Sequence, residues 1–456
     1  MSKHYHFIGI GGIGMSGIAS LLLCSKEKVS GSDLRETAIT RSLTSAGATI
    51  YLGHRPENIN GADTVIYSSA IKEDNPELKE ARRRGIPLLR RAEALAILMR
   101  EKKVITVTGS HGKTTTTSLV SYLLMKAGLS PTVAIGGILR NIDTNACLGN
   151  GEFFVAEADE SDGSFLFYHP VYSIVTNIDR EHLDYYRNFN REVAAFREFI
   201  EKTDKGGCVF CCADDENIKK IVFGYAGKCI LFGLNPPADI YPQKIKLSGL
   251  TSEFDCLYRD KFVDRFHLSL GGLHNISNAL AVIALGLELG IDIMTIKEAL
   301  SEYKGARRRL EIKFEDQRYL VIDDYAHHPT EIRATLLAVR QLNRKRLIAI
   351  FQPHRYSRTR ILLEEFAISF ESADCVIITD IYPASEPPIE GINGRRVCEQ
   401  IKQNNPEKEV LYMPKEEIVG FILKIIKPHD LVLTLGAGDI VKICDELVER
   451  LKGNSN

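Results

Sequence analysis

The sequence predicts an α/β protein whose parallel sheets carry helices on both faces and are divided among three domains. Runs rich in β-branched residues alternate with amphipathic helical patterns along the chain, which is typical of parallel strands joined by crossover helices. Three segments each restart with such a run, followed by a glycine-rich or polar turn and a helix. The chain has 456 residues, more than one hydrophobic core normally serves, so several domains are expected.

Two charged stretches separate the three segments. The first is REKK at 100–103 and the second is KGARRR at 304–309. Domain boundaries usually fall in exposed polar segments. We therefore expect domains at 1–100, 101–306 and 307–456.

The first domain opens with a strand, a glycine-rich turn and a helix. Gly9, Gly11 and Gly14 have the G-x-G-x-x-G spacing, and Asp33 follows a second strand-like run. Such glycines let a helix N-terminus approach a pyrophosphate while the acid reaches a ribose or a base, so a Rossmann-like domain is expected. The spacing leaves NAD and a UDP-sugar open, because both carry a diphosphate. The residues expected at this ligand are Gly11, Gly12, Ile13, Gly14, Ser16 and Asp33.

The second domain opens with a phosphate-binding loop. Residues 104–119, VITVTGSHGKTTTTSL, combine a β-branched run, a turn with two glycines and the start of a helix. Main-chain N–H groups of such a turn converge on a phosphate, while Lys113 supplies a mobile charge and Thr114 a hydroxyl for Mg²⁺. A P-loop domain with a parallel-rich sheet that binds a nucleoside triphosphate is expected. Its nucleotide-binding residues are Gly109, Ser110, His111, Gly112, Lys113, Thr114 and Thr115.

Polar clusters follow two later strands of this domain. Glu157 ends the run EFFVAE, and His182 follows VYSIVTNI. Strand ends in a wound sheet converge on the ligand crevice, so both side chains are expected to complete the Mg²⁺ coordination that Thr114 begins.

A helix is expected to start in HNISNA, at 274–279. Asn275 and Asn278 either cap this helix or reach an adenine edge, and capping accounts for one of them. The arginines at 307–309 form either a solvated face or a charge that offsets a transferring phosphoryl group.

The third domain, also expected to be Rossmann-like, carries polar residues at two strand ends. Asp324, Tyr325 and His327 end or follow the run YLVIDD. Arg355 and Arg358 follow the next strand and have a spacing that suits a carboxylate or a phosphate.

The bulk composition excludes several classes of partner. Lys and Arg number 58 against 59 Asp and Glu, so no net field draws the chain to nucleic acid or anionic lipid. Ten cysteines without a regular framework fit a reducing cytoplasm. The apolar stretch at 7–25 is interrupted by glycines and is expected to form a strand, a turn and a helix rather than a signal peptide. No spanning helix is expected.

These motifs, in this order, resemble the Mur ligase family across nearly the whole chain. The phosphate loop alone occurs in many enzymes. The combination of EADESD at 157–162, DDYAHHPTE at 323–331 and HRYSRT at 354–359 is far more specific.

The resemblance implies an ADP-forming amide ligase that uses ATP and Mg²⁺, with UDP-N-acetylmuramate held by the first domain and L-alanine by the third. It selects UDP over NAD. Related ligases often carry a carbamylated lysine after the metal-binding histidine, but no lysine stands between His182 and Lys202, so none is expected here. Beyond the glycine loops, the resemblance implies that Thr114, Glu157 and His182 bind metal, Asn275 and Arg308 bind ATP, Ser161, Asp162 and Tyr325 bind substrate, and Asp324, His327, Arg355 and Arg358 act at the amino acid.

The expected chemistry is activation of a carboxylate as an acyl phosphate, followed by attack of the alanine amine. Lys113 would stabilise the transferring phosphoryl group, and His327 or Asp324 would accept the amine proton. Three alternatives stay open. They are a recycling ligase that attaches a preformed peptide to the same UDP-sugar, an NAD-dependent oxidoreductase, and a nucleotide-gated binding module without chemistry.

Overall fold

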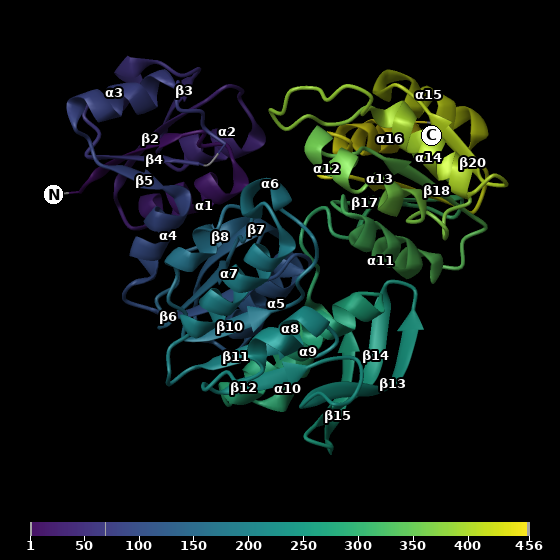
Figure 1. Ribbon diagram of the computed structural model, residues 1–456, viewed down its shortest axis with the longest axis horizontal. Coiled ribbons are helices and arrows are strands. Elements are labelled where there is room, and N and C mark those ends of the chain that lie inside the picture. The colour runs from purple at the N-terminus through teal and green to yellow at the C-terminus, as the bar shows by residue number, and fades with distance from the viewer. Residues whose placement is uncertain (1, 69, 454–456) are drawn as a thin grey trace. The chain divides into compact units, whose positions relative to one another are not determined.

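The computed structural model describes residues 2–68 and 70–453, which form an α/β fold with three parallel-rich sheets (Figure 1). The chain divides into two compact units. The first contains the chain up to Gln243 with 255–266 and 277–304. The second contains 244–254, 267–276 and the chain from Gly305 onward.

The N-terminal sheet has the strand order β3-β2-β1-β4-β5, with every pair parallel. This order confirms the expected Rossmann-like fold, in which a ligand crevice opens where the strand order reverses beside the central strand β1. Phe7, Ile8 and Val65 are fully buried at its centre. Its elements are β1 (His4–Ile8), α1 (Ile13–Cys24), β2 (Lys28–Asp33), α2 (Ala38–Ser45), β3 (Thr49–Leu52), β4 (Thr64–Tyr67), α3 (Pro76–Arg84), β5 (Leu88–Arg90) and α4 (Arg91–Met99).

The central sheet has the order β15-β14-β13-β12-β11-β10-β6-β9-β7-β8. The strands from β12 to β7 pair in parallel, and β8 closes one edge antiparallel to β7. Its strands are β6 (Lys103–Thr108), β7 (Thr132–Leu139), β8 (Thr144–Cys147), β9 (Phe153–Glu157), β10 (Tyr172–Val175), β11 (Cys208–Cys212), β12 (Cys229–Phe232), β13 (Ile240–Ser248), β14 (Thr251–Tyr258) and β15 (Lys261–Leu268). Its helices are α5 (Lys113–Lys126), α6 (Leu183–Tyr186), α7 (Phe189–Glu201), α8 (Glu216–Val222), α9 (Leu273–Glu288) and α10 (Ile293–Glu302).

The C-terminal sheet has the order β16-β17-β21-β18-β19-β20, in which only the edge pair β16–β17 is antiparallel among the described strands. Its strands are β16 (Glu311–Glu315), β17 (Tyr319–Asp324), β18 (Arg346–Phe351), β19 (Cys375–Ile378), β20 (Glu409–Tyr412) and β21 (Asp430–Leu435). Its helices are α11 (Pro329–Arg340), α12 (Tyr356–Ile361), α13 (Leu363–Ala367), α14 (Gly394–Asn404), α15 (Lys415–Ile425) and α16 (Val441–Gly453).

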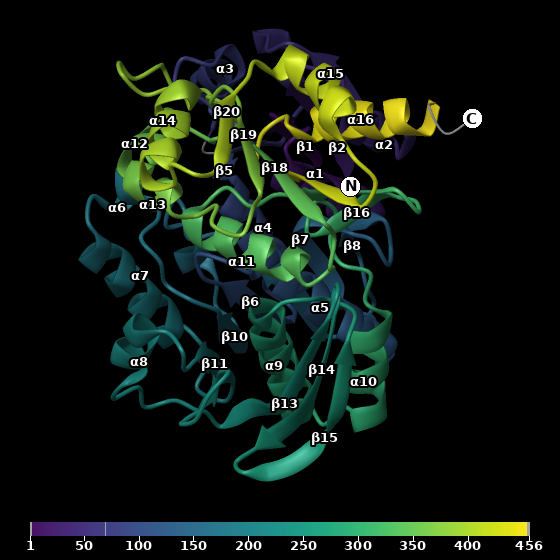
Figure 2. The same cartoon turned by 90° about the vertical axis from the view of Figure 1, so that its right-hand side faces the viewer.

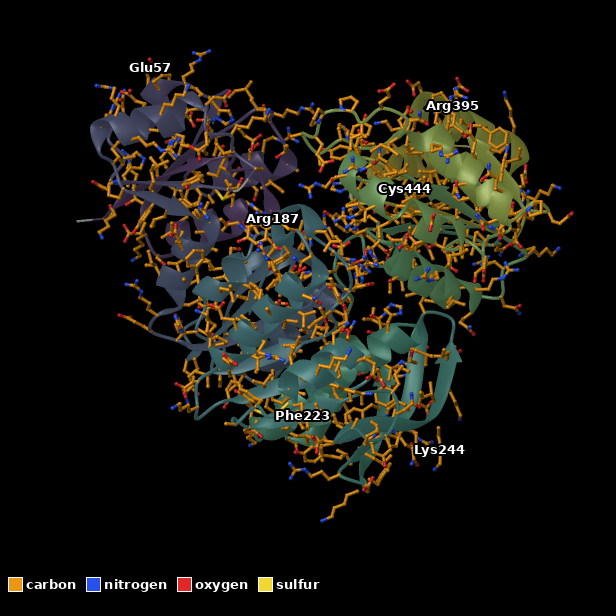
Figure 3. The ribbon with its side chains drawn as sticks, in the orientation of Figure 1. Glu57, Arg187, Phe223, Lys244, Arg395 and Cys444 are labelled. Atoms are coloured by element: carbon orange, nitrogen blue, oxygen red, sulfur yellow. The ribbon has the colours of Figure 1, made fainter. Side chains whose placement is uncertain are left out.

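Alternate residues of these C-terminal strands enter two separate cores, because successive side chains of a strand point to opposite faces. Leu320 and Ile322 pack with α11, α13 and α14, whereas Val321 packs with α15 and α16. These helices are labelled in Figure 2. Cys444, labelled in Figure 3, lies in the second of these cores. The sheet is therefore wound on both faces, as the sequence predicts.

Most expected elements are confirmed and two features are new. The apolar stretch at 7–25 forms the end of β1, a turn and α1, and Cys208 and Cys211 are free thiols in the buried strand β11. The antiparallel edge strand β16 and the strands β13 to β15 were not expected. Within 2–68 and 70–453, no helix has both the length and the apolar character needed to cross a membrane.

Candidate functional site

The phosphate-binding loop connects β6 to α5, as expected. Gly109 has a φ of 130°, and a Cβ placed there would lie 2.9 Å from the main-chain oxygen of Asn177. Gly112, with a φ of 81°, is the N-cap of α5. Both positions require glycine, because an L side chain is strained at these φ values. The loop therefore presents its main chain at the N-terminus of α5, where an anion is stabilised.

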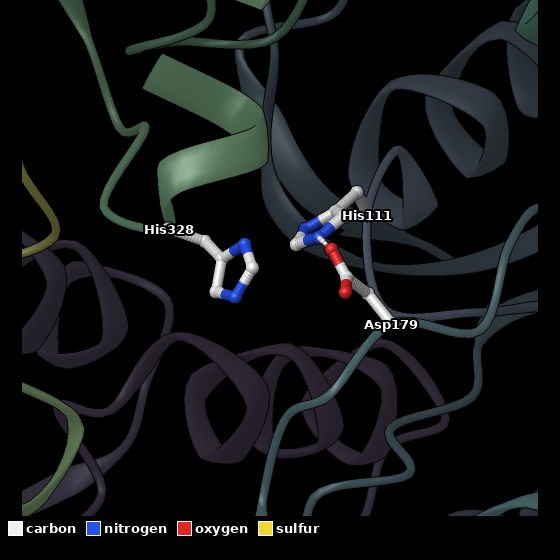
Figure 4. A group of neighbouring side chains, drawn as sticks. All are labelled: His111, Asp179 and His328. Carbon is white, nitrogen blue, oxygen red and sulfur yellow. Dashed lines mark hydrogen bonds and ion pairs between the residues drawn. The ribbon is translucent and has the colours of Figure 1, made fainter. Parts of the chain in front are cut away.

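The segment after β10 holds this loop from one side. The Ser110 N–H donates to the Asn177 carbonyl at 3.0 Å, and the His111 N–H donates to the Asn177 side-chain oxygen at 2.8 Å. The Asp179 N–H donates to the Ser110 hydroxyl, and the His111 ring lies 3.0 Å from the Asp179 carboxylate (Figure 4). Ser110 and His111 are thus fixed by a neighbouring strand end, which the sequence pattern did not indicate.

Lys113 folds back over the loop that precedes it. Its ammonium donates to the Glu160 carboxylate at 2.8 Å and to the carbonyls of Gly109 and Ser110 at 2.6 and 3.1 Å. Burial lowers the pKa of Lys113, but the charges of Glu160 and Asp159 outweigh it, so the pKa lies above its usual value. The lysine is charged and pre-positioned at the mouth of the phosphate loop.

Thr114 and Glu157 come together as the sequence predicts. The Thr114 hydroxyl lies 3.2 Å from the Glu157 carboxylate, whose other oxygen accepts the Gly136 N–H at 2.9 Å. Burial raises the pKa of Glu157. A hydroxyl and a carboxylate are the hard oxygen ligands that Mg²⁺ prefers, so this pair fits the ion. The next residue of the loop helix, Thr115, is buried.

His182 lies between two other carboxylates. Its Nε2 atom is 3.1 Å from Glu181 and 3.5 Å from Glu160. Burial lowers the pKa of this ring, but the hydrogen bonds to Glu160 and Glu181 outweigh it and raise the pKa to about 10. A protonated imidazole cannot ligate a metal. His182 would therefore have to lose its proton before it could join Thr114 and Glu157 at a metal.

The glycine loop of the N-terminal domain is closed by Asp33. The Gly11 N–H donates to the Asp33 carboxylate at 2.9 Å, and Gly12 is the N-cap of α1. The Ser16 hydroxyl donates to the Ile13 carbonyl inside α1 and is buried. This loop is an uncharged turn braced by one acid at the end of β2.

A cavity of about 170 Å³ lies between this glycine loop and the end of β9 that carries Glu157. Arg91, at the start of α4, lines this cavity and forms an ion pair with Asp159 at 3.1 Å. Burial raises the pKa of Asp159, but Arg91 and Lys113 outweigh it and lower the pKa to about 2. Among the residues that line the cavity are Ile13, Gly14, Gly17, Arg91, Glu157 and Asp159.

Two expected substrate residues, Ser161 and Asp162, shape the turn after β9. The Ser161 N–H donates to the Asp159 carboxylate at 3.1 Å, and the Asp162 carboxylate accepts the Ser164 N–H at 3.1 Å. They therefore hold the turn that presents Asp159 and Glu160. Arg91 and Glu160 were not singled out from the sequence.

The expectation that an asparagine caps the helix in HNISNA was wrong. Helix α9 begins at Leu273, so Asn275 and Asn278 both lie inside it. The Asn275 amide donates to the Gly271 carbonyl at 2.8 Å. The Asn278 side-chain oxygen lies 2.8 Å from where a Cβ on Gly112 would stand, next to the phosphate loop.

In the second unit, Asp324 ends β17 with both carboxylate oxygens occupied. One accepts the Ala326 N–H at 2.8 Å and the other accepts the Leu310 N–H at 2.7 Å. Burial raises the pKa of Asp324 to about 6. His327 lies 3.3 Å from Glu331 and is less buried, while His328, also labelled in Figure 4, caps α11.

Arg308 is bound within the second unit. Its guanidinium donates to Asp323 at 2.8 Å and to the carbonyls of Gly436 and Gly438 at 2.7 and 3.1 Å. The Tyr325 ring lies near both Arg308 and Arg309, at 5.2 and 5.1 Å from the guanidinium carbons. These contacts fix the loop after β21 against the end of β17.

Arg355 and Arg358 flank the start of α12, and each has a neighbour that the sequence pattern missed. Arg355 lies 3.1 Å from Glu386, which also accepts the Ser357 hydroxyl at 2.7 Å. Arg358 lies 3.1 Å from a ring nitrogen of His354. No sequence motif marks Glu386 as a neighbour of Arg355, because Glu386 stands in a loop that precedes α14.

Three family models match consecutive parts of the chain. They are described as the Mur ligase family catalytic domain, at residues 4–103, the Mur ligase middle domain, at 107–286, and the Mur ligase glutamate ligase domain, at 308–438.

Similar proteins cover the full length. The UDP-N-acetylmuramate–L-alanine ligase of Pelotomaculum thermopropionicum is 48% identical over 454 residues, which cover 99% of this chain and 98% of that protein. The enzyme of the same name from Aquifex aeolicus is 45% identical over 450 residues, covering 98% of each.

Two solved structures are similar over their whole length. The UDP-N-acetylmuramate–alanine ligase of Thermotoga maritima has a TM-score of 0.86 at 34% identity, covering 100% of both chains. A murein peptide ligase from Psychrobacter arcticus has a TM-score of 0.74 at 25% identity, covering 99% of both. Of these two, the alanine ligase is the more similar in both sequence and fold.

Proposed function

Because this chain belongs to the Mur ligase family, we propose that it joins L-alanine to the carboxylate of UDP-N-acetylmuramate and converts ATP to ADP and phosphate. The observation that carries this is the 45–48% identity, over nearly the full length, to ligases of that name. The reaction is a step in the synthesis of peptidoglycan precursors. The greater similarity to the alanine ligase structure favours it over peptide recycling.

The first half of the reaction activates the acid. A carboxylate is a poor acylating agent, since its leaving group would be oxide. Transfer of the γ-phosphoryl group of ATP to this carboxylate forms an acyl phosphate, and Lys113 at the mouth of the phosphate loop offsets the charge of the transferring group. The cavity between the glycine loop and Glu157 supports a path for the acid to this loop.

Mg²⁺ is the proposed metal ion, with Thr114 and Glu157 as its ligands and His182 as a third once deprotonated. When bound, the ion would neutralise charge on the phosphates. Asn275 is the proposed adenine contact and Arg308 a further nucleotide contact. Arg308 is supported less well, because Asp323 and two carbonyls already engage it.

The second half of the reaction forms the amide. The alanine nitrogen attacks the activated carbonyl, and phosphate leaves with the bonding electrons of the broken C–O bond. We assign Arg355 and Arg358 to the alanine carboxylate. His327 is favoured over Asp324 as the base that accepts the amine proton, because both Asp324 oxygens already accept main-chain hydrogen bonds.

The proposed UDP-sugar contacts are Gly11, Gly12, Ile13, Gly14, Ser16 and Asp33. Ser161, Asp162 and Tyr325 are also proposed to bind substrate. We propose domain boundaries near 100 and 306, supported by the limits of the three family models. A cytoplasmic location is proposed from the use of ATP and from the free cysteines.

Phosphate release tests the reaction. Purified protein with ATP, Mg²⁺ and UDP-N-acetylmuramate should release phosphate quickly only when L-alanine is added, and mass spectrometry should detect the alanyl product. Release with the tripeptide but not with alanine would instead identify a recycling ligase. No release with either would contradict ligase function.

A further inference from the structure

Glu160 has no role in the proposed reaction, although it lies beside Lys113. It follows β9 in the turn held by Ser161 and Asp162, and its side chain is fully buried. Its backbone carbonyl accepts the Tyr186 hydroxyl at 2.5 Å. The carboxylate is therefore fixed in the interior of the site rather than on its rim.

The Lys113 ammonium and the His182 ring contact the same oxygen of this carboxylate. The Lys113 ammonium lies 2.8 Å from Oε1, and His182 Nε2 lies 3.5 Å from the same atom. The other oxygen, Oε2, is buried and has no hydrogen-bond donor among the described residues. A buried carboxylate is costly unless it is paired. Its pairing here depends on the lysine and the histidine together.

Lys113 therefore has two competing partners once a nucleotide arrives. In the structure its ammonium donates to Glu160 and to two carbonyls of its own loop. A triphosphate in that loop offers several anionic oxygens to the same ammonium. A lysine stem can turn from one to the other, since its rotatable bonds allow the ammonium to pivot.

We propose that Glu160 is a positioning residue: it holds Lys113 at the phosphate loop before a nucleotide binds, releases it to the phosphates, and keeps His182 in place. This inference rests on the proposed ATP-dependent function. Holding the lysine limits the side-chain freedom that nucleotide binding must remove. The same contact opposes binding, because the lysine must leave a charged partner before it reaches the phosphates.

Binding of ADP without metal measures this competition directly. Isothermal titration calorimetry in EDTA should give a dissociation constant about tenfold lower for Glu160→Gln than for the wild type, since glutamine keeps the shape but not the charge. Glu181→Gln is the matched control, because it removes an equal charge that contacts His182, at 3.1 Å. The control should change ADP affinity by less than about threefold.

A second variant separates contact from charge. Glu160→Asp keeps the charge on a shorter side chain that cannot reach Lys113 as closely, so it should also bind ADP more tightly than the wild type. With Mg²⁺ and all substrates, Glu160→Gln should lose at least about tenfold in kcat without a higher KM for ATP. General damage to the fold would raise this KM as well.

Three results would overturn the proposal. They are ADP binding by Glu160→Gln no tighter than in the wild type, an equal gain in Glu181→Gln, and Glu160→Asp indistinguishable from the wild type. A wild-type protein that binds no ADP at all would contradict the nucleotide site itself, and so is a separate outcome.

Discussion

The phosphate loop and the N-terminal glycine loop have the same local plan and different surroundings. Each follows a parallel strand and ends at the N-terminus of a helix. The phosphate loop is surrounded by Lys113, Glu157, Glu160 and His182, whereas the glycine loop has Asp33 bound to its main chain and the Arg91 guanidinium beside Gly14. A strand, a tight turn and a helix suffice to bind a phosphate group, but transfer of one requires organised charge.

This contrast predicts that changes in the phosphate loop affect the rate of reaction, while changes in the glycine loop affect the affinity for the UDP-sugar. Substitutions of Arg355 and Arg358 should affect only the KM for alanine. Each of these expectations can be tested separately, because the kinetic parameters of the three substrates can be measured independently.

Lys113→Ala should have the largest effect. Loss of its charge at the transferring phosphoryl group should lower kcat on the order of 10³-fold, measured as phosphate release with all substrates. Lys126→Ala is the matched control at the other end of α5, where the lysine makes exposed ion pairs with Glu298 and Glu302. Near wild-type turnover of Lys113→Ala would remove the distinction between the two loops.

Arg358→Ala should raise the KM for alanine about 30-fold and leave the KM for ATP unchanged, since truncating a charged hydrogen bond costs about 2 kcal/mol. Steady-state kinetics with each substrate varied in turn measure this. Arg360→Ala is the control, because Arg360 is an exposed residue of the same helix. Unchanged alanine kinetics would place Arg358 outside the amino-acid site.

Gly11→Ala should raise the KM for the UDP-sugar about tenfold with little change for ATP. A Cβ at this position would lie 2.8 Å from the Asp33 carboxylate, so the loop must shift. Gly420→Ala is the control, because the added carbon inside α15 would meet no atom within 4 Å beyond its chain neighbours and the backbone of its own helix. An equal loss of ATP affinity in Gly11→Ala would contradict separate roles for the two loops.

The last effect expected is on stability rather than on kinetics, at Asp324. Burial raises its pKa to about 6 from an ordinary 3.8, so the native state binds a proton more tightly than the unfolded chain. The free energy of unfolding should fall as the pH rises from about 4 to about 6, by at most about 3 kcal/mol.

Asp324→Asn should flatten this pH dependence in urea unfolding series at several pH values. Asp374→Asn, which removes an exposed partner of Arg340, should leave the slope as in the wild type. A wild-type slope in Asp324→Asn would mean that another group is responsible.

Local sequence patterns predicted the fold and the two loops well. The run before Gly109 is β-branched and fully buried from Val104 to Thr108, so strand, turn and helix all followed from residue type. Glycine spacing likewise located the turn before α1. Such features depend on near neighbours in the chain, which a sequence displays directly.

The parts of the site that were missed depend on distant residues. Glu160 and Arg91 look like ordinary surface charges in the sequence, and their importance comes from partners such as Lys113 and Asp159 that lie 47 and 68 positions away. The expected asparagine cap failed for a related reason, because α9 starts earlier, at Leu273, than the polar residues suggest. Burial and long-range pairing, rather than residue type, decide these roles.

Arg91 connects the glycine loop to the turn after β9. A Cβ on Gly14 would lie 2.8 Å from its guanidinium, and the same guanidinium forms an ion pair with Asp159 in the turn after β9. A bulky residue at position 14 would therefore push on an ion pair two residues from Glu157. Unlike Gly11→Ala, such a substitution would lower kcat as well as the affinity for the UDP-sugar, because one arginine would transmit the crowding to Asp159.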